Sequence, residues 1–270
     1  MKVVKVRFSK GGMGRTDGCE AAPDAILVES EDLFLNESKK EIEFSVDEIS
    51  VDDSDYGGSF ERIEEFSENI SKKNKDLIDN GKKPEKVVFL GGDHSITYPL
   101  VKGIRKNFKA GFVVFDSHPD CENFFEPPTH EDYLRTLIEG KVLDKNDVLI
   151  IGLRNWDSNE VVYIDDKKIR YVMMKDIFEN GISWVSDYIL EFAKDYDYLY
   201  CSIDIDAIDP AYAPATGYIE PGGLSSREFL TMISAIRNKV LYADIVEINP
   251  KKDFNNMTLK LGAKILWELF

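Results

Sequence analysis

The sequence alternates between short apolar runs and longer amphipathic stretches, and this alternation limits the folds that it can adopt. Most of the runs are apolar on both faces, as strands are when helices cover a sheet on two sides. They are KVVFL (86–90), GFVVF (111–115), DVLIIGL (147–153), RYVMM (170–174), YLYCSI (198–203) and DIVEI (244–248). The series predicts an α/β protein built from βαβ units around a mostly parallel sheet.

Helical periodicity follows or separates these runs. The predicted helices lie in 95–108, 130–140, 183–196, 225–239 and 258–270. Ser225 and Glu228 form an S-x-x-E capping box, which marks the start of one of them. Since no repeat, low-complexity tract or Pro/Gly-rich linker divides the sequence, we expect a single α/β domain over residues 1–270.

The charge and the cysteines exclude several classes of protein. A net charge of -16 disfavours binding to nucleic acid or to an anionic membrane, and favours cationic small molecules or metal ions. The 3 cysteines are far apart and form no C-x-x-C pair, which argues against a disulfide framework or a structural zinc site. The N-terminal MKVVKVRFSK lacks the apolar core of a signal peptide, so we expect a soluble cytoplasmic protein.

Acidic residues and histidines follow three of the predicted strands. In parallel α/β folds, ligands bind at the carboxyl ends of the strands, so these side chains are expected to share one crevice. They occur in VVFLGGDHS (Asp93, His94), VVFDSHPD (Asp116, His118, Asp120) and YCSIDIDAIDP (Asp204, Asp206, Asp209). All 3 histidines of the chain lie between His94 and His130.

Aspartates that converge in a crevice repel one another unless a cation or protons compensate their charge. Carboxylate oxygens with a minority of imidazoles suit a hard ion such as Mn²⁺. A D-x-D pair is usually a solvated turn, and Gly-Gly-Asp turns are common, but their occurrence at successive strand ends favours a metal site. The candidate ligands are sufficient for two ions about 3.5 Å apart. They are His94, Asp116, His118, Asp120, Asp204 and Asp206.

Three of these stretches resemble the metal-binding signatures of the ureohydrolases, the family that includes arginase and agmatinase. They are GGDHS (91–95), DSHPD (116–120) and SIDIDAIDPAYAPATG (202–217). GCEAAPDAI (18–26), IEPGGLSSRE (219–228) and ADIVEINPKKD (243–253) extend the resemblance over nearly the whole chain. It implies a three-layer α/β/α sandwich, two Mn²⁺ per subunit on the same six ligands, and a homo-oligomer, trimeric or hexameric. The implied reaction is hydrolysis of a guanidino compound to urea and an amine.

The resemblance also implies catalytic residues. Two metal ions would lower the pKa of a water molecule, so that hydroxide attacks the guanidinium carbon near neutral pH. Asp120 would relay a proton, His130 would shuttle it to the leaving amine, and Glu247 would pair with the guanidinium. His130 departs from the family pattern, because it lies closer to Asp120 than expected and is followed by two acidic residues. It is alternatively a histidine at a helix N-terminus, while Tyr218 replaces a usual threonine and reshapes the pocket.

The substrate is expected to be a cationic guanidine. Glu122 stands where arginases have an asparagine that binds the amino acid end, and a carboxylate there would repel that end. Asp157 at another strand end would receive an ammonium group. These residues favour agmatine, cleaved to putrescine and urea, although Glu122 alternatively points to water and Trp156 alternatively packs. Arginase, guanidino-acid hydrolase and formimidoylglutamase activities, or a catalytically silent metal-binding protein, remain the alternatives.

Overall fold

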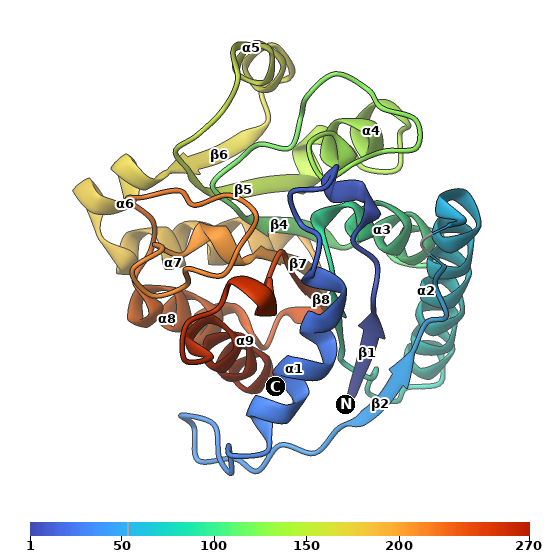
Figure 1. Cartoon of the computed structure of the whole chain (residues 1–270). Coiled ribbons are helices and arrows are strands. Elements are labelled where there is room, and N and C mark those ends of the chain that lie inside the picture. Colours follow the sequence, from blue (N-terminus) through green and yellow to red (C-terminus); the bar gives the residue numbers. More distant parts are fainter. Residues whose placement is uncertain (53) are drawn as a thin grey trace.

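The computed structural model describes residues 1–52 and 54–270, and its centre is an 8-stranded sheet in which every pair of neighbouring strands is parallel. The strand order is β2-β1-β3-β8-β7-β4-β5-β6. The strands are β1 (Lys2–Val6), β2 (Ser45–Glu48), β3 (Val87–Gly91), β4 (Gly111–Phe115), β5 (Val148–Leu153), β6 (Arg170–Met173), β7 (Leu199–Asp204) and β8 (Val240–Val246). Figure 1 shows the sheet between two layers of helices.

One layer contains α1 (Ala22–Ser30), α6 (Met174–Asn180), α7 (Ile182–Phe192), α8 (Ser226–Ile236) and α9 (Met257–Leu269). The other contains α2 (Tyr56–Asp79), α3 (Thr97–Arg105), α4 (Tyr133–Glu139) and α5 (Ser158–Lys167). The alternation of side chains along each strand divides the core between the layers. In β4, Val113 and Phe115 pack toward α7 and α8, while Phe112 and Val114 pack toward α2 and α3. The predicted three-layer α/β/α architecture is therefore confirmed.

The predicted strands are present to within one residue at each end, except that β8 is Val240–Val246 and so begins and ends earlier than DIVEI. Each predicted helix is present, and the Ser225 side chain accepts a hydrogen bond from the Glu228 backbone, as a capping box requires. The sequence interpretation did not identify α2, whose buried face toward α3 includes Ser67 and Ser71. Its apolar residues Phe60, Ile63, Phe66 and Ile70 nevertheless recur every three or four positions, so the signal for this helix was present in the sequence.

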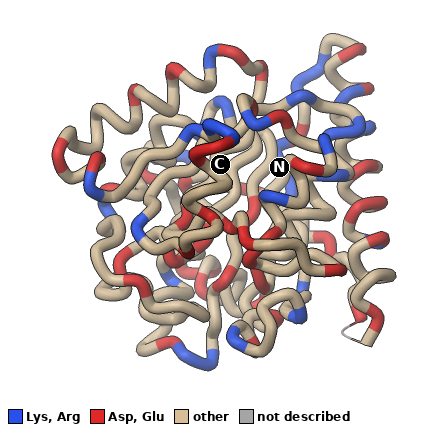
Figure 2. The backbone as a smooth tube through the Cα atoms, turned by 90° about the horizontal axis from the view of Figure 1, so that it is seen from above, with Lys and Arg blue, Asp and Glu red and all other residues tan. Residues whose placement is uncertain are grey.

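The strand order brings the carboxyl ends of β3, β7 and β4 to one region of the sheet, with β8 between β3 and β7. Figure 2, which looks at the molecule from above, shows acidic residues grouped near the middle of this edge. Over the described residues, no helix combines the length and the apolar character needed to cross a lipid bilayer.

Candidate metal centre and substrate pocket

The turn after β3 places His94 beneath the pocket. Gly92 passes so close to β1 that a Cβ atom built on it would lie 1.9 Å from the carbonyl oxygen of Phe8. Asp93 then fixes the turn, because its carboxylate accepts hydrogen bonds from the backbone N–H groups of Ser95 and Gly12, each at 2.9 Å. This explains why the GGDHS stretch contains a glycine and an aspartate before the histidine.

The turns after β4 and β7 use their own carboxylates in the same way. Asp116 Oδ1 accepts from the backbone N–H of His118 at 2.7 Å, and Asp204 Oδ1 accepts from that of Asp206 at 2.8 Å. Asp206 Oδ1 in turn accepts from the backbone N–H of Ser117 at 3.1 Å, which joins the two turns. In Asp116 and in Asp204, therefore, one carboxylate oxygen holds the turn by a hydrogen bond. The other oxygen is available to a metal ion.

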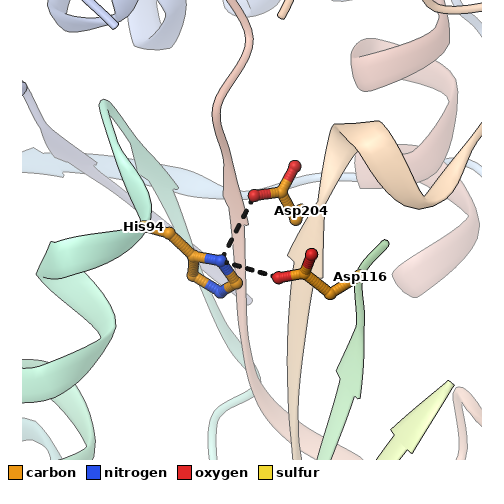
Figure 3. A group of neighbouring side chains, drawn as sticks. All are labelled: His94, Asp116 and Asp204. Carbon is orange, nitrogen blue, oxygen red and sulfur yellow. Dashed lines mark ion pairs between the residues drawn. The ribbon is translucent and has the colours of Figure 1, made fainter. Parts of the chain in front are cut away.

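Three of these aspartates meet the imidazole of His94 (Figure 3 draws two of them). His94 Nδ1 lies 3.1 Å from Asp116 Oδ2, 3.0 Å from Asp120 Oδ2 and 3.2 Å from Asp204 Oδ2. One ring nitrogen has at most one hydrogen to donate, so it cannot satisfy three carboxylates. His94 Nδ1 and Asp116 Oδ2 are buried and have no hydrogen-bond partner among the described residues. Such a convergence of ligand atoms is what a cation would satisfy.

A buried hydrogen-bond network fixes the ring of His94. Ser202 Oγ donates to Asp244 Oδ1 at 2.6 Å and lies 2.9 Å from His94 Nε2. Since the single hydroxyl hydrogen goes to Asp244, Ser202 accepts a hydrogen from Nε2. In the neutral ring, the lone pair is then on Nδ1, the nitrogen that faces the three aspartates. His94 is thus oriented as metal-binding histidines usually are.

The charges at this point also call for a cation. Burial and the charge of Asp116 raise the pKa of Asp120 well above its usual range, and burial and Asp206 do the same for Asp204. Both carboxyl groups would otherwise take up protons. His118 Nδ1 lies beside them, 3.1 Å from Asp206 Oδ2 and 3.5 Å from Asp116 Oδ1. All six sequence-predicted ligands are therefore together, and an oxygen-rich set with two imidazoles fits a hard divalent ion such as Mn²⁺.

Glu247 and His130 lie next to this cluster. Glu247 Oε1 is 3.1 Å from His130 Nδ1, whereas Glu247 Oε2 is buried without a hydrogen-bond partner in the described structure. Burial opposes protonation of His130, but the contact with Glu247 outweighs it and raises the pKa of His130 to about 9. His130 precedes α4, as the alternative interpretation held, and it also lines the pocket.

The backbone is strained at two of these positions. Asp120 has a φ of 49° and Glu247 a φ of 65°, a left-handed conformation that residues with a side chain rarely adopt. Both residues lie where a strand has just ended and the chain turns. Strain of this kind persists when the surrounding structure holds it in place, and it is common at functional sites.

The cluster opens into a cavity of about 220 Å³ that is lined largely by acidic side chains. Glu122 and Asp157, the predicted substrate residues, both line it, as do Trp156 and Tyr218. The Glu122 carboxylate accepts from Asn123 at 2.8 Å and from Asn159 at 3.3 Å, which holds it at the wall. None of the lining side chains in the described part of the chain is Lys or Arg.

Sequence reasoning missed Glu160 and assigned no function to Glu131, and both line the cavity. Glu160 is buried, and its two oxygens accept from the backbone N–H groups of Cys121 at 3.0 Å and Asp157 at 2.9 Å. It thereby joins the turns after β4 and β5. The D-x-x-E spacing from Asp157 was the available signal, because it is typical of a helix start. Cys121 is fully buried in the core.

The family model described as "Arginase family" matches residues 1–270. The chain belongs to the arginase family. An arginase of Staphylococcus aureus (strain MRSA252) is 30% identical over 259 residues, covering 88% of this chain and 84% of the relative. This arginase-family chain is accordingly a hydrolase of amidino carbon–nitrogen bonds.

Solved structures show the same arginase-like fold. A formimidoylglutamase from Bacillus subtilis has a TM-score of 0.89 at 23% identity, with 99% of this chain and 85% of that chain covered. An agmatine ureohydrolase of Thermoplasma volcanium has a TM-score of 0.79 at 27% identity, with 99% and 87% covered. The predicted family is therefore confirmed, while these relatives of the arginase-family chain differ in substrate.

Proposed function

We propose that the protein is a manganese-dependent agmatinase, which hydrolyses agmatine to putrescine and urea. The observation that carries this proposal is the acidic pocket mouth, where Glu122, Asp157 and Glu131 meet no Lys or Arg among the described lining residues. Agmatine is cationic at both ends and lacks a carboxylate. Arginine would bring a carboxylate next to these side chains, and the repulsion would weaken its binding.

The proposed metal ligands are the six residues that converge at the strand ends, and they would hold two Mn²⁺. They are His94, Asp116, His118, Asp120, Asp204 and Asp206. When bound, such ions supply the Lewis acidity that makes a water molecule give hydroxide near neutral pH. The unpartnered lone pair of His94 and the raised pKa values of Asp120 and Asp204 support this assignment.

Three side chains of the chain itself are assigned to the reacting group. Glu247 Oε2, buried and unpartnered, accepts hydrogen bonds from the planar guanidinium. His130 gives a proton to the leaving amine, which is a poor leaving group until it is protonated. Asp120 passes a proton toward that amine, and its strained backbone holds the carboxylate beside His94.

The far end of the substrate is assigned to Glu122 and Asp157. Both line the cavity, and Asp157 stands at the start of α5, where Glu160 fixes its backbone. A carboxylate at this position contributes more to selectivity than to affinity. It attracts an ammonium group and repels the carboxylate of an amino acid substrate.

A second candidate is the hydrolysis of an amidino acid, as in the formimidoylglutamases. It is favoured by Arg15, whose guanidinium carbon lies 5.0 Å from the ring centre of Tyr218, a residue of the pocket wall. Arg15 would meet a substrate carboxylate. It is exposed and is not among the residues lining the cavity, so we rank this activity second.

A substrate panel tests the proposal. Mn²⁺-loaded protein is assayed with agmatine, arginine, a guanidino acid and formimidoylglutamate. We expect the highest kcat/KM with agmatine, and Asp157→Asn to raise the KM for agmatine about tenfold while Asp166→Asn, on the exposed side of α5, leaves it unchanged. A preference for formimidoylglutamate would assign the second activity instead, and no turnover of any of the four compounds would exclude both.

We further propose that the protein works in the cytoplasm as a single-domain subunit of a homo-trimer or homo-hexamer. The support is the resemblance to ureohydrolases and the continuous sheet that residues from both ends of the chain share. Light scattering on the purified protein measures the mass, and a monomer at micromolar concentration would contradict the proposed assembly.

A further inference from the structure

Glu131 lies where the family pattern does not place an acid, and the structure gives its carboxylate a defined position. Tyr218 donates a hydrogen bond from its hydroxyl to Glu131 Oε1 at 3.0 Å. The same oxygen is 4.0 Å from His130 Nε2. The Tyr218 ring packs beside two histidines of the pocket wall, with ring centres 5.5 Å from His118 and 5.7 Å from His130.

The backbone around Glu131 is fixed. Its carbonyl oxygen accepts from the N–H of Glu122 at 3.0 Å, and the N–H of His130 donates to the carbonyl of Gly11 at 3.2 Å. The next residue, Asp132, is fully buried and accepts from the backbone N–H of Thr129 at 2.7 Å. Because the backbone is fixed, only the side-chain torsions of Glu131 remain free. The hydrogen bond from Tyr218 fixes these torsions.

His130 needs a route to solvent if it gives away a proton in each turnover. Its Nδ1 is committed to Glu247, so the proton is exchanged at Nε2. That nitrogen is buried and has no hydrogen-bond partner within the described structure. The His130 side chain is only 6% exposed, whereas that of Glu131 is 36% exposed. Glu131 therefore contacts water on one side and faces Nε2 on the other.

We propose that Glu131 is a proton relay between solvent and His130 Nε2, an assignment that rests on the proposed function of His130. When the leaving amine takes the proton, its new N–H bond forms as the Nε2–H bond of the imidazolium breaks. Glu131 then takes a proton from a hydronium ion or a buffer acid of the solvent and passes it to Nε2, which restores both the imidazolium and the Glu131 carboxylate. Tyr218 holds Glu131 in position for this exchange.

The charged and titratable groups around the relay favour this direction of transfer. His130 faces Glu247, Glu131 and Tyr218. The negative charges of Asp93 and Asp120, farther away, also interact with its ring. Nearly all of these are acidic, and they stabilise the imidazolium. The nearby cation is the guanidinium of Arg15, which lies over the ring of Tyr218. Reprotonation slows turnover when solvent protons are scarce, so the relay has its largest effect at alkaline pH.

The test compares Glu131→Gln, which keeps the shape of the side chain, with Glu126→Gln, the same change at an exposed position of the same loop. We expect kcat of Glu131→Gln to fall about tenfold at pH 9 and little at pH 7, with KM unchanged. Rising concentrations of Tris, a small proton donor, should restore it. Tyr218→Phe should show a smaller loss with the same pH dependence, and Glu126→Gln none.

Two results would overturn the relay. One is a kcat of Glu131→Gln equal to that of the active wild type at every pH. The other is a loss that appears only in KM for agmatine, which would assign Glu131 to ammonium binding. NMR titration of the His130 ring tests the contact without turnover: Glu131→Gln should lower its pKa. A wild-type protein that hydrolyses no guanidine would refute the proposed function of the pocket and the relay together.

Discussion

The backbone N–H of His94 donates to Glu247 Oε1 at 2.8 Å, although 153 residues separate them in the sequence. The same oxygen is 3.1 Å from His130 Nδ1. One carboxylate oxygen therefore connects the candidate metal ligand with the candidate proton donor. The other oxygen, Oε2, is left free toward the cavity because both neighbours bind Oε1.

Replacing Glu247 should separate substrate binding from metal binding. Glu247→Gln keeps the size of the side chain and an oxygen acceptor, but removes the negative charge that faces the guanidinium. We expect kcat/KM for agmatine to fall about a hundredfold or more, since the charge-assisted contact of Oε2 with the guanidinium is lost. Manganese content, measured by mass spectrometry of the metals, should stay at the wild-type level. A parallel loss of metal would indicate that Glu247 acts mainly by holding His94.

Replacing Asp116 should abolish metal binding. Its carboxylate faces both His94 and His118, so Asp116→Asn removes charge between the two candidate ion positions. Calorimetric titration with Mn²⁺ should show a loss of affinity of about a hundredfold or more. Asp187→Asn, an exposed position on α7, is the matched control and should bind like wild type. Equal affinity of the two variants would place the metal elsewhere.

Asp244 should affect metal binding although it is not among the described residues that line the pocket. It is fully buried and accepts from Ser202, Thr97 and Tyr200, and through Ser202 it sets the orientation of His94. We expect Asp244→Asn to weaken Mn²⁺ binding about tenfold to a hundredfold, as loss of an outer partner of a metal-binding histidine usually does. Unchanged affinity in the folded variant would show that the network only packs the core.

Gly92 should be intolerant of a side chain for a backbone reason. A methyl group there would meet the Phe8 carbonyl at 1.9 Å, so β1 or the turn must move. We expect Gly92→Ala to lower the free energy of unfolding by about 3 kcal/mol. Gly57→Ala, in the first turn of α2 with open space around its Cβ, should instead raise it by about 0.5 kcal/mol. Chemical denaturation of the metal-free proteins measures both.

His130 should make stability depend on pH. Its pKa is raised from 6.5 to about 9 in the folded state, so the imidazolium stabilises the fold fully below about pH 6.5. This contribution, on the order of 3 kcal/mol, should fade as the pH rises toward 9. The difference in unfolding free energy between metal-free wild type and His130→Gln measures it. A difference that is constant between pH 6 and 10 would contradict the predicted pKa.

The sequence was sufficient to predict the parallel sheet, the helices on both of its faces and the convergence of six candidate ligands, because each depends on local features. Strand ends, alternation of side chains and short acidic motifs are visible within a few residues. The arginase family followed from motifs that extend over nearly the whole chain.

Other parts of the site depend on contacts between distant segments, and the sequence alone does not contain them. Tyr218 bonds to Glu131 across 87 residues, and Asn74 bonds to Tyr242 across 168. The left-handed backbone at Glu247 also has no local signal, since the surrounding fold imposes it. The choice of guanidine depends on such contacts, so the short acidic motifs alone do not determine it.

The position of β8 determines when the sheet can be completed during synthesis of the chain. β8 is the last strand of the chain and lies between β3, which leads to His94, and β7, which ends in Asp204. Until residues 240–246 have left the ribosome, the two halves of the sheet have no strand to join them. A nascent chain that stops short of β8 would thus carry His94 in one half-sheet and Asp116, His118 and Asp204 in the other, so the candidate metal centre would assemble only after β8 has been made.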